Sequence, residues 1–587
     1  MKRALCMILT LSITLSLLAL LISCGGGGDD DDQTQSGPTI VDGYIYPPYH
    51  DYGRDTVNFE DMKYTRPDFD AAKRKFEEAA ALVSDGDISE LTALYKEAEE
   101  LYENASGMTA LIGAMYAKSD NDASMLAEYE SAASALSELS VSADIARTSA
   151  ALCSHAENIS AEVYGGVLLE RYGKFGEYSP SLKTLLYEEA ELIHNYEFAS
   201  SKVTLTFEEV TGTFDYIVET LMLDKIATPS KYAELYFAYS DALSEYRTNV
   251  YTEILKCRSK IASRLGVDSY LEYSYSIAGY DPDEVGRLIQ YAKSYILPVY
   301  DAAAPMYSEF TENTNPGLLS AENLINSLYR TFESMNGELF SVYCYMLQYK
   351  LWSLSDEGDG YTSYISGYNA PFIFSGSSSM MSDYSEFLRL FGQYTFLFKS
   401  NGADMNGAVG RTAETAMLLL VPFYISSGNS DAVEYLTLAS RLSVTDNIIT
   451  GIMLAVFEES AYSLGYDSVT KEALDQFSRE AMLECGMDGS SLSDDFGIED
   501  ILKMEDLYLR GGCGADLLVS GIISAELLSR ESENSGSGVG AYLAFLSSGS
   551  SLSAALSGAG LPSPFSEETV RDASEAISRS LFGNSEQ

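Results

Sequence analysis

Residues 356–394 read DEGDGYTSYISGYNAPFIFSGSSSMMSDYSEFLRLFGQY, a Gly- and Tyr-rich segment that runs into the apolar residues Pro371 to Phe374. An apolar run of this length after turn-forming residues is typical of a β-strand. A second strand signal occurs where apolar residues alternate with threonine at 203–207. Because strand signals are this sparse, the sequence predicts a small sheet and not a large one.

Helical signals begin upstream, at Arg66. Asp87 and Glu90 have the spacing of a capping box, and apolar residues then recur at helical spacing until Asn104 and Gly107. This pattern predicts an amphipathic helix that starts after Asp87 and ends near Gly107.

The same helical pattern returns further along the chain. Asp281 with Pro282 predicts a capped helix with proline at its first position, and Ser566 precedes two glutamates in another predicted first turn. The Ser- and Gly-rich segments 535–540 and 547–553 are expected to be loops. No repeat of fixed period occurs, which argues against a helical solenoid. The sequence predicts a mostly helical, all-α fold with a small β-sheet.

The N-terminus has the pattern of an export signal. Lys2 and Arg3 precede the uncharged, mostly apolar stretch 4–23, and Leu-Ile-Ser then leads into Cys24. This layout predicts a lipoprotein signal peptide over 1–23 and acylation of Cys24. A retained transmembrane anchor or a plain secretory peptide are the alternatives.

Residues 24–65 are rich in Gly, Asp, Tyr and Pro and are expected to form a flexible acidic tether and an irregular lead-in. The body is then expected outside the cytoplasm, attached to the bacterial cell membrane through Cys24.

The charge balance excludes one class of partner. With 87 acidic against 37 basic residues, the formal net charge is 37 − 87 = −50. Such a surface repels polyphosphate, so nucleic acid is not an expected partner. Most of the carboxylates are interpreted as solvated helix faces.

Residue types that usually carry catalysis are scarce. The three histidines, His50, His155 and His194, are never three or four residues apart, so they predict no helical zinc site, and no GxSxG or phosphate-loop motif is present. Five cysteines remain after Cys24 and contain no CxxC, which indicates mostly buried thiols and neither a disulfide framework nor a zinc ribbon.

The stretch 356–394 resembles the oligoendopeptidase F branch of the thimet oligopeptidase metallopeptidases, in which a Gly- and Tyr-rich loop and a Pro-Phe strand lead into an HExxH helix. Where that family has His-Glu-Phe-Gly-His, this chain has Arg389-Leu390-Phe391-Gly392-Gln393. Phe391 and Gly392 match the motif, while both zinc-binding histidines and the glutamate that activates water are replaced.

Further positions extend the resemblance over about residues 60–587, most weakly before 180. Glu414 lies 25 residues after Arg389, where the family has its third zinc ligand. Tyr508 matches a tyrosine of the family's substrate cleft, but Gly511 and Gly512 follow where a second tyrosine is expected. Segments 230–275, which contain LGVDSYLEY, and 541–570 are similar to the family's flanking helical segments.

The resemblance implies two helical lobes, residues 66–230 and a zincin-like half at 231–587, around a deep cleft for extended peptides. Zinc is expected for the family, but no cofactor is expected here because its ligands are missing. Arg389 instead places a fixed positive charge at the metal position, which disfavours a divalent cation, and it is expected to pair with Glu414.

These observations favour a monomeric pseudo-peptidase that binds peptides or a partner protein in the cleft without cleaving them. Two alternatives stay open. One is an active zinc endopeptidase or oligopeptidase that uses ligands outside the usual motif, and the other is a helical surface lipoprotein that captures glycans or other solutes.

Overall fold

The computed structural model describes residues 38–41, 43–83, 86–119, 122–166, 168–169, 180–197, 199–223, 229–313, 321–355, 360–376, 381–425, 430–486, 497–502, 506–549 and 551–583. The predicted signal peptide at 1–23 and the predicted acylation site Cys24 lie outside these residues. Within them, no helix is both long and apolar enough to cross a membrane.

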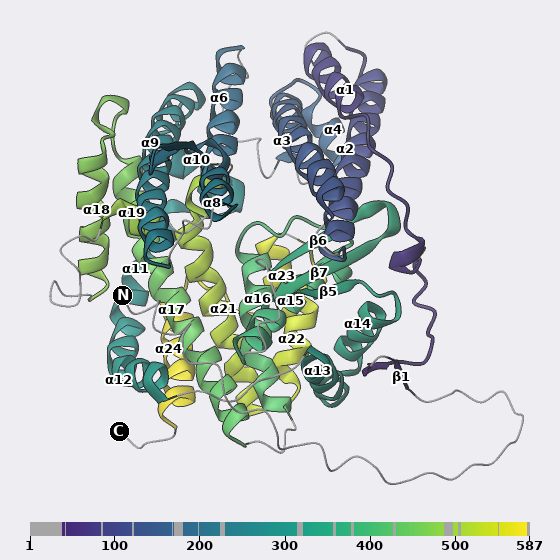
Figure 1. Cartoon of the computed structure of the whole chain (residues 1–587), viewed down its shortest axis with the longest axis vertical. Helices are drawn as coiled ribbons and strands as arrows, with labels where there is room; N and C mark the ends of the chain where they lie inside the picture. The colour runs from purple at the N-terminus through teal and green to yellow at the C-terminus, as the bar shows by residue number, and fades with distance from the viewer. Residues whose placement is uncertain are drawn as a thin grey trace, which may run out of the picture.

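The chain enters through a strand pair, β1 (Thr39–Val41) and β2 (Tyr44–Tyr46), and the short 3-10 helix η1 (Phe59–Asp61). This lead-in is mostly irregular, as its composition predicts, but it is attached to the body. The Arg54 guanidinium lies 3.9 Å from the centre of the Phe398 ring and donates to the Asn369 carbonyl. The amide of Phe59 donates to the Tyr349 carbonyl at 3.0 Å. The lead-in therefore crosses the outside of the later half of the chain (Figure 1).

Four helices form a bundle with its own hydrophobic core at the upper right of Figure 1. They are α1 (Phe69–Leu82), α2 (Ile88–Ala117), α3 (Ala123–Ala151) and α4 (Ala156–Val163). Asp87 caps α2 as predicted, accepting from the amide of Ser89 at 2.9 Å. The predicted end of this helix at Asn104 and Gly107 is wrong, because α2 continues to Ala117.

Gly107 lies inside α2 because a neighbouring segment presses against it. A Cβ at this position would lie 2.2 Å from the Ser366 Oγ, which itself donates to the carbonyl of Glu103. The glycine therefore permits close packing on η2 (Ser366–Tyr368) and does not end the helix.

A second group of elements lies at the upper left of Figure 1. It contains α6 (Pro180–Glu197), α7 (Ala199–Lys202), the hairpin β3 (Leu205–Phe207) and β4 (Val210–Gly212), α8 (Phe214–Leu223), α9 (Pro229–Leu265) and α10 (Tyr270–Ala278). The alternation at 203–207 thus forms a strand from Leu205 onward. The predicted lobe boundary at residue 230 lies within α9, and the division into two lobes there stays a prediction.

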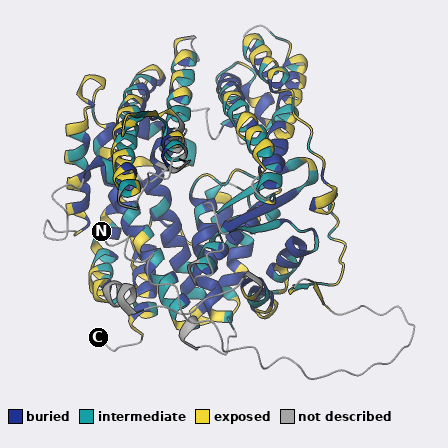
Figure 2. Ribbon diagram, viewed as in Figure 1, coloured by how far each residue is buried: buried dark blue, intermediate teal, exposed yellow. Residues whose placement is uncertain are grey.

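The rest of the described chain is built mainly of helices, most of which form a body below these two groups (Figure 1). These are α11 (Pro282–Tyr295), α12 (Leu297–Asn313), α13 (Ala321–Met335), α14 (Gly337–Gln348), α15 (Met381–Ser400), α16 (Ala408–Leu420), η3 (Val421–Tyr424), α17 (Ser430–Tyr462), η4 (Tyr466–Ser468), α18 (Lys471–Glu484), α19 (Ile498–Ile501), α20 (Asp506–Leu509), α21 (Cys513–Glu533), α22 (Ser537–Leu546), α23 (Leu552–Ala559) and α24 (Glu567–Phe582). Figure 2 shows the buried residues concentrated here, where one large hydrophobic core joins α17, α21 and their neighbours.

The predicted strand at Pro371 to Phe374 forms the centre of the only three-stranded sheet in the described residues. The strands are β5 (Trp352–Ser355), β6 (Tyr361–Ile365) and β7 (Ala370–Gly376), in the order β5-β7-β6. β7 pairs parallel with β5 and antiparallel with β6, so Ile373 faces both Trp352 and Thr362. The prediction of a helical fold with a small sheet is confirmed.

Two predicted helix caps are present, and one predicted loop is partly helical. Asp281 and Ser566 cap α11 and α24 as expected. The loop predicted at 535–540 is wrong from Ser537 onward, because α22 begins there. The Glu531 carboxylate of α21 accepts from the amides of Gly536 and Val539 and so supplies the cap that the local sequence lacks.

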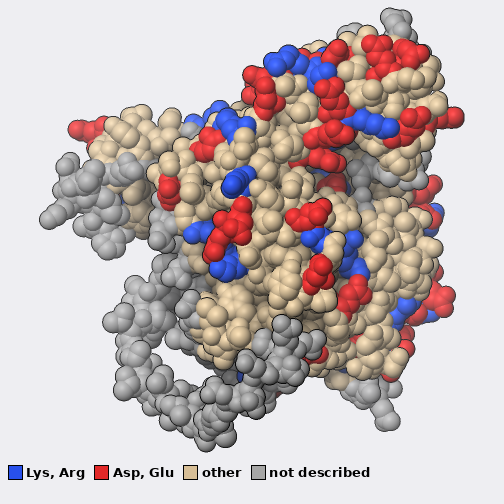
Figure 3. All heavy atoms as spheres, turned by 90° about the vertical axis from the view of Figure 1, so that its right-hand side faces the viewer, with Lys and Arg blue, Asp and Glu red and all other residues tan. Residues whose placement is uncertain are grey.

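The acidic residues are spread over the surface as expected for solvated helix faces. On the face seen in Figure 3, Asp and Glu side chains lie among Lys and Arg side chains over the α1–α4 bundle and over the body below it. Surface ion pairs such as Arg66 with Glu128, 2.7 Å apart, bring some of these opposite charges together.

Candidate functional site

The residues at the predicted motif position, 389–393, lie on α15, the helix that follows the sheet in the chain. One side of this helix is core: the Phe391 ring is fully buried and lies 4.6 Å from the Phe332 ring and 5.4 Å from the Tyr343 ring, centre to centre. Residues 386, 389 and 393 follow at helical spacing on another side, so their side chains share one stripe of the helix.

A close helix crossing places Glu414 opposite this stripe. A Cβ at Gly392 would lie 2.2 Å from the Ala413 carbonyl oxygen, so only glycine lets α15 approach α16 at this point. The next residue of α16 is Glu414. Gly392 therefore allows the close approach that brings residues 389 and 393 near residue 414.

These side chains form one hydrogen-bonded cluster. Arg389 Nε and Nη2 donate to the two carboxylate oxygens of Glu386, at 3.1 and 2.7 Å. Arg389 Nη1 donates to Glu414 Oε2 at 3.0 Å, and Gln393 Nε2 donates to Glu414 Oε1 at 2.5 Å. The pair predicted between Arg389 and Glu414 is present, and each oxygen of Glu414 has a donor.

The side chains of the cluster differ in how far they are exposed to solvent. The Glu414 side chain is 10% exposed, whereas those of Arg389 and Glu386 are each 35% exposed. Burial alone would lower the pKa of the Arg389 guanidinium, but the hydrogen bonds and charges of Glu386 and Glu414 outweigh it and raise that pKa above its usual range. Arg389 therefore stays charged and compensates a nearly buried carboxylate.

This donor set does not fit zinc. Zinc sites use imidazole, thiolate and carboxylate ligands, and positions 389 and 393 offer a guanidinium and an amide that already occupy both oxygens of Glu414. Leu390 is 1% exposed and has no group that exchanges a proton. In the described residues, no group of three His, Cys, Asp or Glu side chains is placed to hold a metal.

The Tyr508 side chain packs in the core against α6. Its ring is buried and stacked on Tyr196, with centres 3.9 Å apart, and its carbonyl accepts from Arg258 at 2.7 Å. A Cβ at Gly511 would lie 2.8 Å from the Ser274 Oγ, so a tyrosine does not fit at this position of the present packing. A role for Tyr508 in lining a cleft stays a prediction.

Two features were not found from the sequence. Glu386 is one helical turn before Arg389, and that spacing is the signal that indicates an ion pair. The second is a buried network around Arg258, whose side chain is fully buried and donates to Glu189 at 2.6 Å and to the Tyr462 hydroxyl at 2.8 Å.

The same network holds a second buried carboxylate, that of Glu458. Its two oxygens accept from the amides of Gly512 and Gly514, at 2.7 and 3.0 Å. Burial raises the pKa of Glu458 to about 7 even though these amides and Arg258 act in the opposite direction. The network ties α9 and α17 to the segment that carries Tyr508.

The remaining chemically active residue types are dispersed. His50 is exposed beside Tyr52, His155 precedes α4, and His194 lies on α6. The five cysteines of the described chain are free thiols, four of them buried and Cys153 half-buried, which confirms the prediction of mostly buried thiols.

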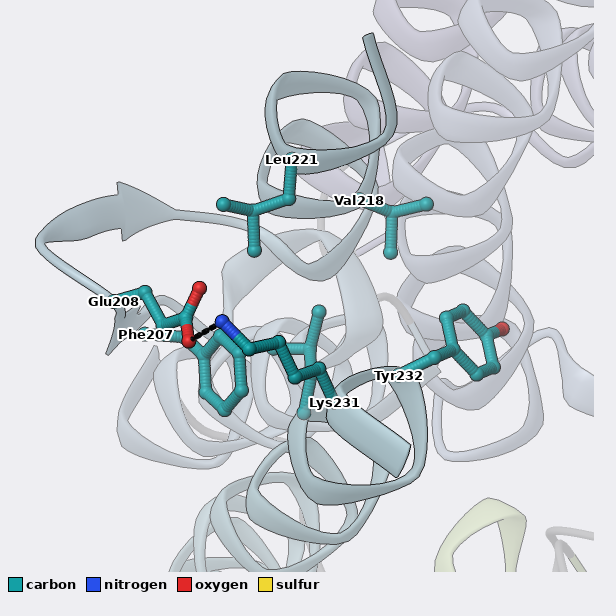
Figure 4. Close-up of a pocket in the computed structure, with 7 residues that line it drawn as sticks. Phe207, Glu208, Val218, Leu221, Lys231 and Tyr232 are labelled. Carbon is teal, nitrogen blue, oxygen red and sulfur yellow. Dashed lines mark hydrogen bonds and ion pairs between the residues drawn. The ribbon is translucent and has the colours of Figure 1, made fainter. Parts of the chain in front are cut away.

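A hollow beside the β3–β4 hairpin is too small for a ligand. Phe207, Val218 and Leu221 line it, and the Glu208–Lys231 ion pair closes one side (Figure 4). Its volume of about 10 Å³ corresponds to a single water molecule. A larger groove lies between α6 and α9.

Comparisons with known proteins identify the fold. No family model matches the chain, and no curated protein matches it. Among solved structures, PZ peptidase A, solved with an inhibitor, is 18% identical and superposes with a TM-score of 0.68 over 89% of this chain and 99% of that chain. A protein assigned as an oligoendopeptidase F from Bacillus anthracis is 18% identical, with a TM-score of 0.66 over 90% and 99%.

The oligoendopeptidase-F of Enterococcus faecium is also similar, at 13% identity and a TM-score of 0.52 over 87% of this chain and 97% of that chain. Each match spans nearly the whole of the other protein, so the likeness includes both the α1–α4 bundle and the body. The chain therefore has the mostly helical fold of the oligoendopeptidase F structures.

Proposed function

We propose that this protein is an extracytoplasmic lipoprotein that uses an oligoendopeptidase F-like fold to bind peptides or a partner protein without hydrolysing them. The observation that carries this proposal is the Arg389–Glu414 pair, with Nη1 3.0 Å from Oε2. It supplies a permanent cation where a peptidase of this fold needs a metal that activates water.

The cluster retains a capacity to bind a peptide. A guanidinium has five N–H donors, and Arg389 uses three of them on Glu386 and Glu414. The remaining donors, on Nη1 and Nη2, belong to a side chain that is 35% exposed. They suit the carbonyl oxygen of an extended peptide, because a charge-assisted hydrogen bond is stronger than a neutral one.

Hydrolysis and binding are tested separately. The purified chain is incubated with a quenched fluorescent peptide library, with and without zinc or a chelator, and the expected result is no cleavage in any condition. Cleavage that the chelator abolishes would overturn the proposal and favour an active zinc peptidase. Binding is measured by fluorescence anisotropy with labelled peptides from the same library.

The binding arm uses Arg389→Met, which removes the donors and keeps most of the side-chain length. Peptide affinity is expected to fall by about tenfold, the equivalent of 1.4 kcal/mol. Arg287→Met on α11 is the matched control, because Arg287 is exposed and lies on a helix outside the cluster. Equal affinity of the two variants would contradict the assigned role of Arg389.

The membrane partner and the location are part of the proposal and have their own test. Cys24→Ala is expected to abolish incorporation of radiolabelled palmitate and to release the protein from the membrane fraction. A Cys24→Ala protein that stays in the membrane fraction would indicate a retained transmembrane anchor instead.

A further inference from the structure

A groove between α6 and α9 has a cationic lining rich in hydroxyl groups. Its volume is about 490 Å³, within the range of small-molecule sites. One wall comes from α6, the other from α9, and Tyr466 of η4 completes the lining. The lining residues are Ser181, Thr184, Leu185, Ser259, Lys260, Ser263, Arg264 and Tyr466. Five of these eight carry a hydroxyl, two carry a positive charge, and none carries a carboxylate.

The periodicity of α9 explains this lining. Ile261 and Leu265 are buried in the core on one side of the helix. The pairs 259–260 and 263–264 are one turn apart on another side, so both cations and both serines face the groove together. Core packing therefore leaves a polar, cationic stripe next to α6.

The two cations are poorly compensated in an otherwise acidic protein. Lys260 Nζ lies 3.5 Å from the Glu188 carboxylate, and both of these side chains are exposed, a setting in which an ion pair contributes little. Arg264 has no ion pair among the described residues. The whole chain is acidic, with 87 acidic and 37 basic residues. The groove, in contrast, has two cations and one exposed carboxylate beside them, so it attracts anions locally.

Tyr466 adds a flat apolar surface. Its side chain is 42% exposed, and Lys260 Nζ lies 4.8 Å from the centre of its ring. The hydroxyl-bearing walls match the hydroxyls of a ligand, and the partly exposed aromatic face matches its C–H faces. The two cations match a negatively charged group on the same ligand. We propose that this groove binds an anionic sugar, in which Lys260 and Arg264 hold the phosphate or carboxylate and the hydroxyl-bearing side chains hold the ring.

The test is isothermal titration calorimetry of the purified full-length chain in detergent at low ionic strength, where exposed charges are least screened. The probes are glucose 6-phosphate and glucuronate, with neutral glucose and inorganic phosphate as comparisons. Both sugar anions are expected to bind, and glucose and inorganic phosphate are each expected to bind at least about tenfold more weakly.

Variants assign the binding to the groove. Lys260→Met with Arg264→Met is expected to weaken glucose 6-phosphate binding at least about tenfold, and Tyr466→Ala is the second variant. Lys256→Met is the matched control, because Lys256 lies one turn earlier on α9, pairs with Glu253 at 2.8 Å and is outside the lining.

Three results would overturn the proposal: no heat with either sugar anion, unchanged affinity in the double variant, or inorganic phosphate binding as tightly as glucose 6-phosphate. Because the groove contains no residue of the Arg389 cluster, a negative result here leaves the peptide-binding proposal untouched.

Discussion

Replacing Arg389 and Gln393 with histidine should create a zinc site from this scaffold. Both native side chains reach the Glu414 carboxylate, at 3.0 and 2.5 Å, so positions 389, 393 and 414 already converge on one point. Two imidazoles four residues apart on one helix face, with a carboxylate from a second helix, have the ligand types and spacing that zinc uses. We expect the double variant Arg389→His with Gln393→His to bind one zinc ion per chain.

The structure also allows the change in stability of the double variant to be estimated. Without metal, the double variant loses the guanidinium beside Glu414, whose side chain is 10% exposed, and this loss costs about 1–3 kcal/mol of unfolding free energy. Zinc at about 100 times its dissociation constant returns about 2.7 kcal/mol. For a chain of 587 residues this corresponds to a rise in Tm of about 2 °C.

The measurements are elemental analysis after gel filtration and thermal melts with and without zinc. The triple variant that adds Glu414→Gln is the matched control, because it keeps both histidines and loses the carboxylate ligand, and its zinc affinity should fall at least about tenfold. A double variant that folds but holds no more zinc than the wild type would refute the geometric reasoning. It would mean that the three positions do not occupy the arrangement of a metal site.

Three further predictions test the packing, the buried network and the thiols. Gly392→Ala should lower the free energy of unfolding by about 2–4 kcal/mol in urea titrations, because its Cβ would lie 2.2 Å from the Ala413 carbonyl oxygen. Gly286→Ala is the control and should be neutral or stabilising, because a Cβ at Gly286 meets open space. Equal effects of the two substitutions would contradict the close crossing of α15 and α16. Because burial raises the pKa of Glu458 from 4.5 to about 7, its contribution to stability is complete below pH 4.5 and is lost as the pH rises through 7, by up to about 3 kcal/mol. Glu458→Gln should therefore show a smaller fall in unfolding free energy between pH 5 and pH 8, on a scale of about 1.4 kcal/mol per pKa unit, and an unchanged fall would show that this carboxyl is ionised throughout. A thiol reagent should modify only Cys153 of the five body cysteines in the native protein, because the other four are buried, and rapid reaction of a second one would indicate local opening.

Local signals in the sequence predicted those parts of the fold that local physics controls. Asp87, Asp281 and Ser566 each accept a hydrogen bond from the first turn of a helix, as their positions indicated. The wrong predictions concern positions whose conformation depends on contact with another segment of the chain. Gly107 has the appearance of a helix end until Ser366 is placed against it, and the start of α22 depends on Glu531, a residue of a different helix.

The candidate site was predictable to the extent that it depends on spacing along the chain. The distance from Arg389 to Glu414 in the sequence, together with the family resemblance, was enough to predict their ion pair. Arg258 and Glu458 gave no such signal, because their partners come from residues 69 and 54 positions away, Glu189 and Gly512. Contacts of that separation follow from the packed fold and not from local patterns.

The Glu414 carboxylate is stabilised by a neighbouring side-chain cation. A carboxylate that is 10% exposed needs a nearby cation, and in a zinc enzyme the metal would supply it. Here Arg389 supplies one positive charge, and Glu386 fixes its orientation through two hydrogen bonds. Removing Arg389 alone would leave Glu414 with only the neutral amide of Gln393. Arg389 therefore compensates the charge of Glu414, as a metal cation would. Leu390, in contrast, has no group that can activate water.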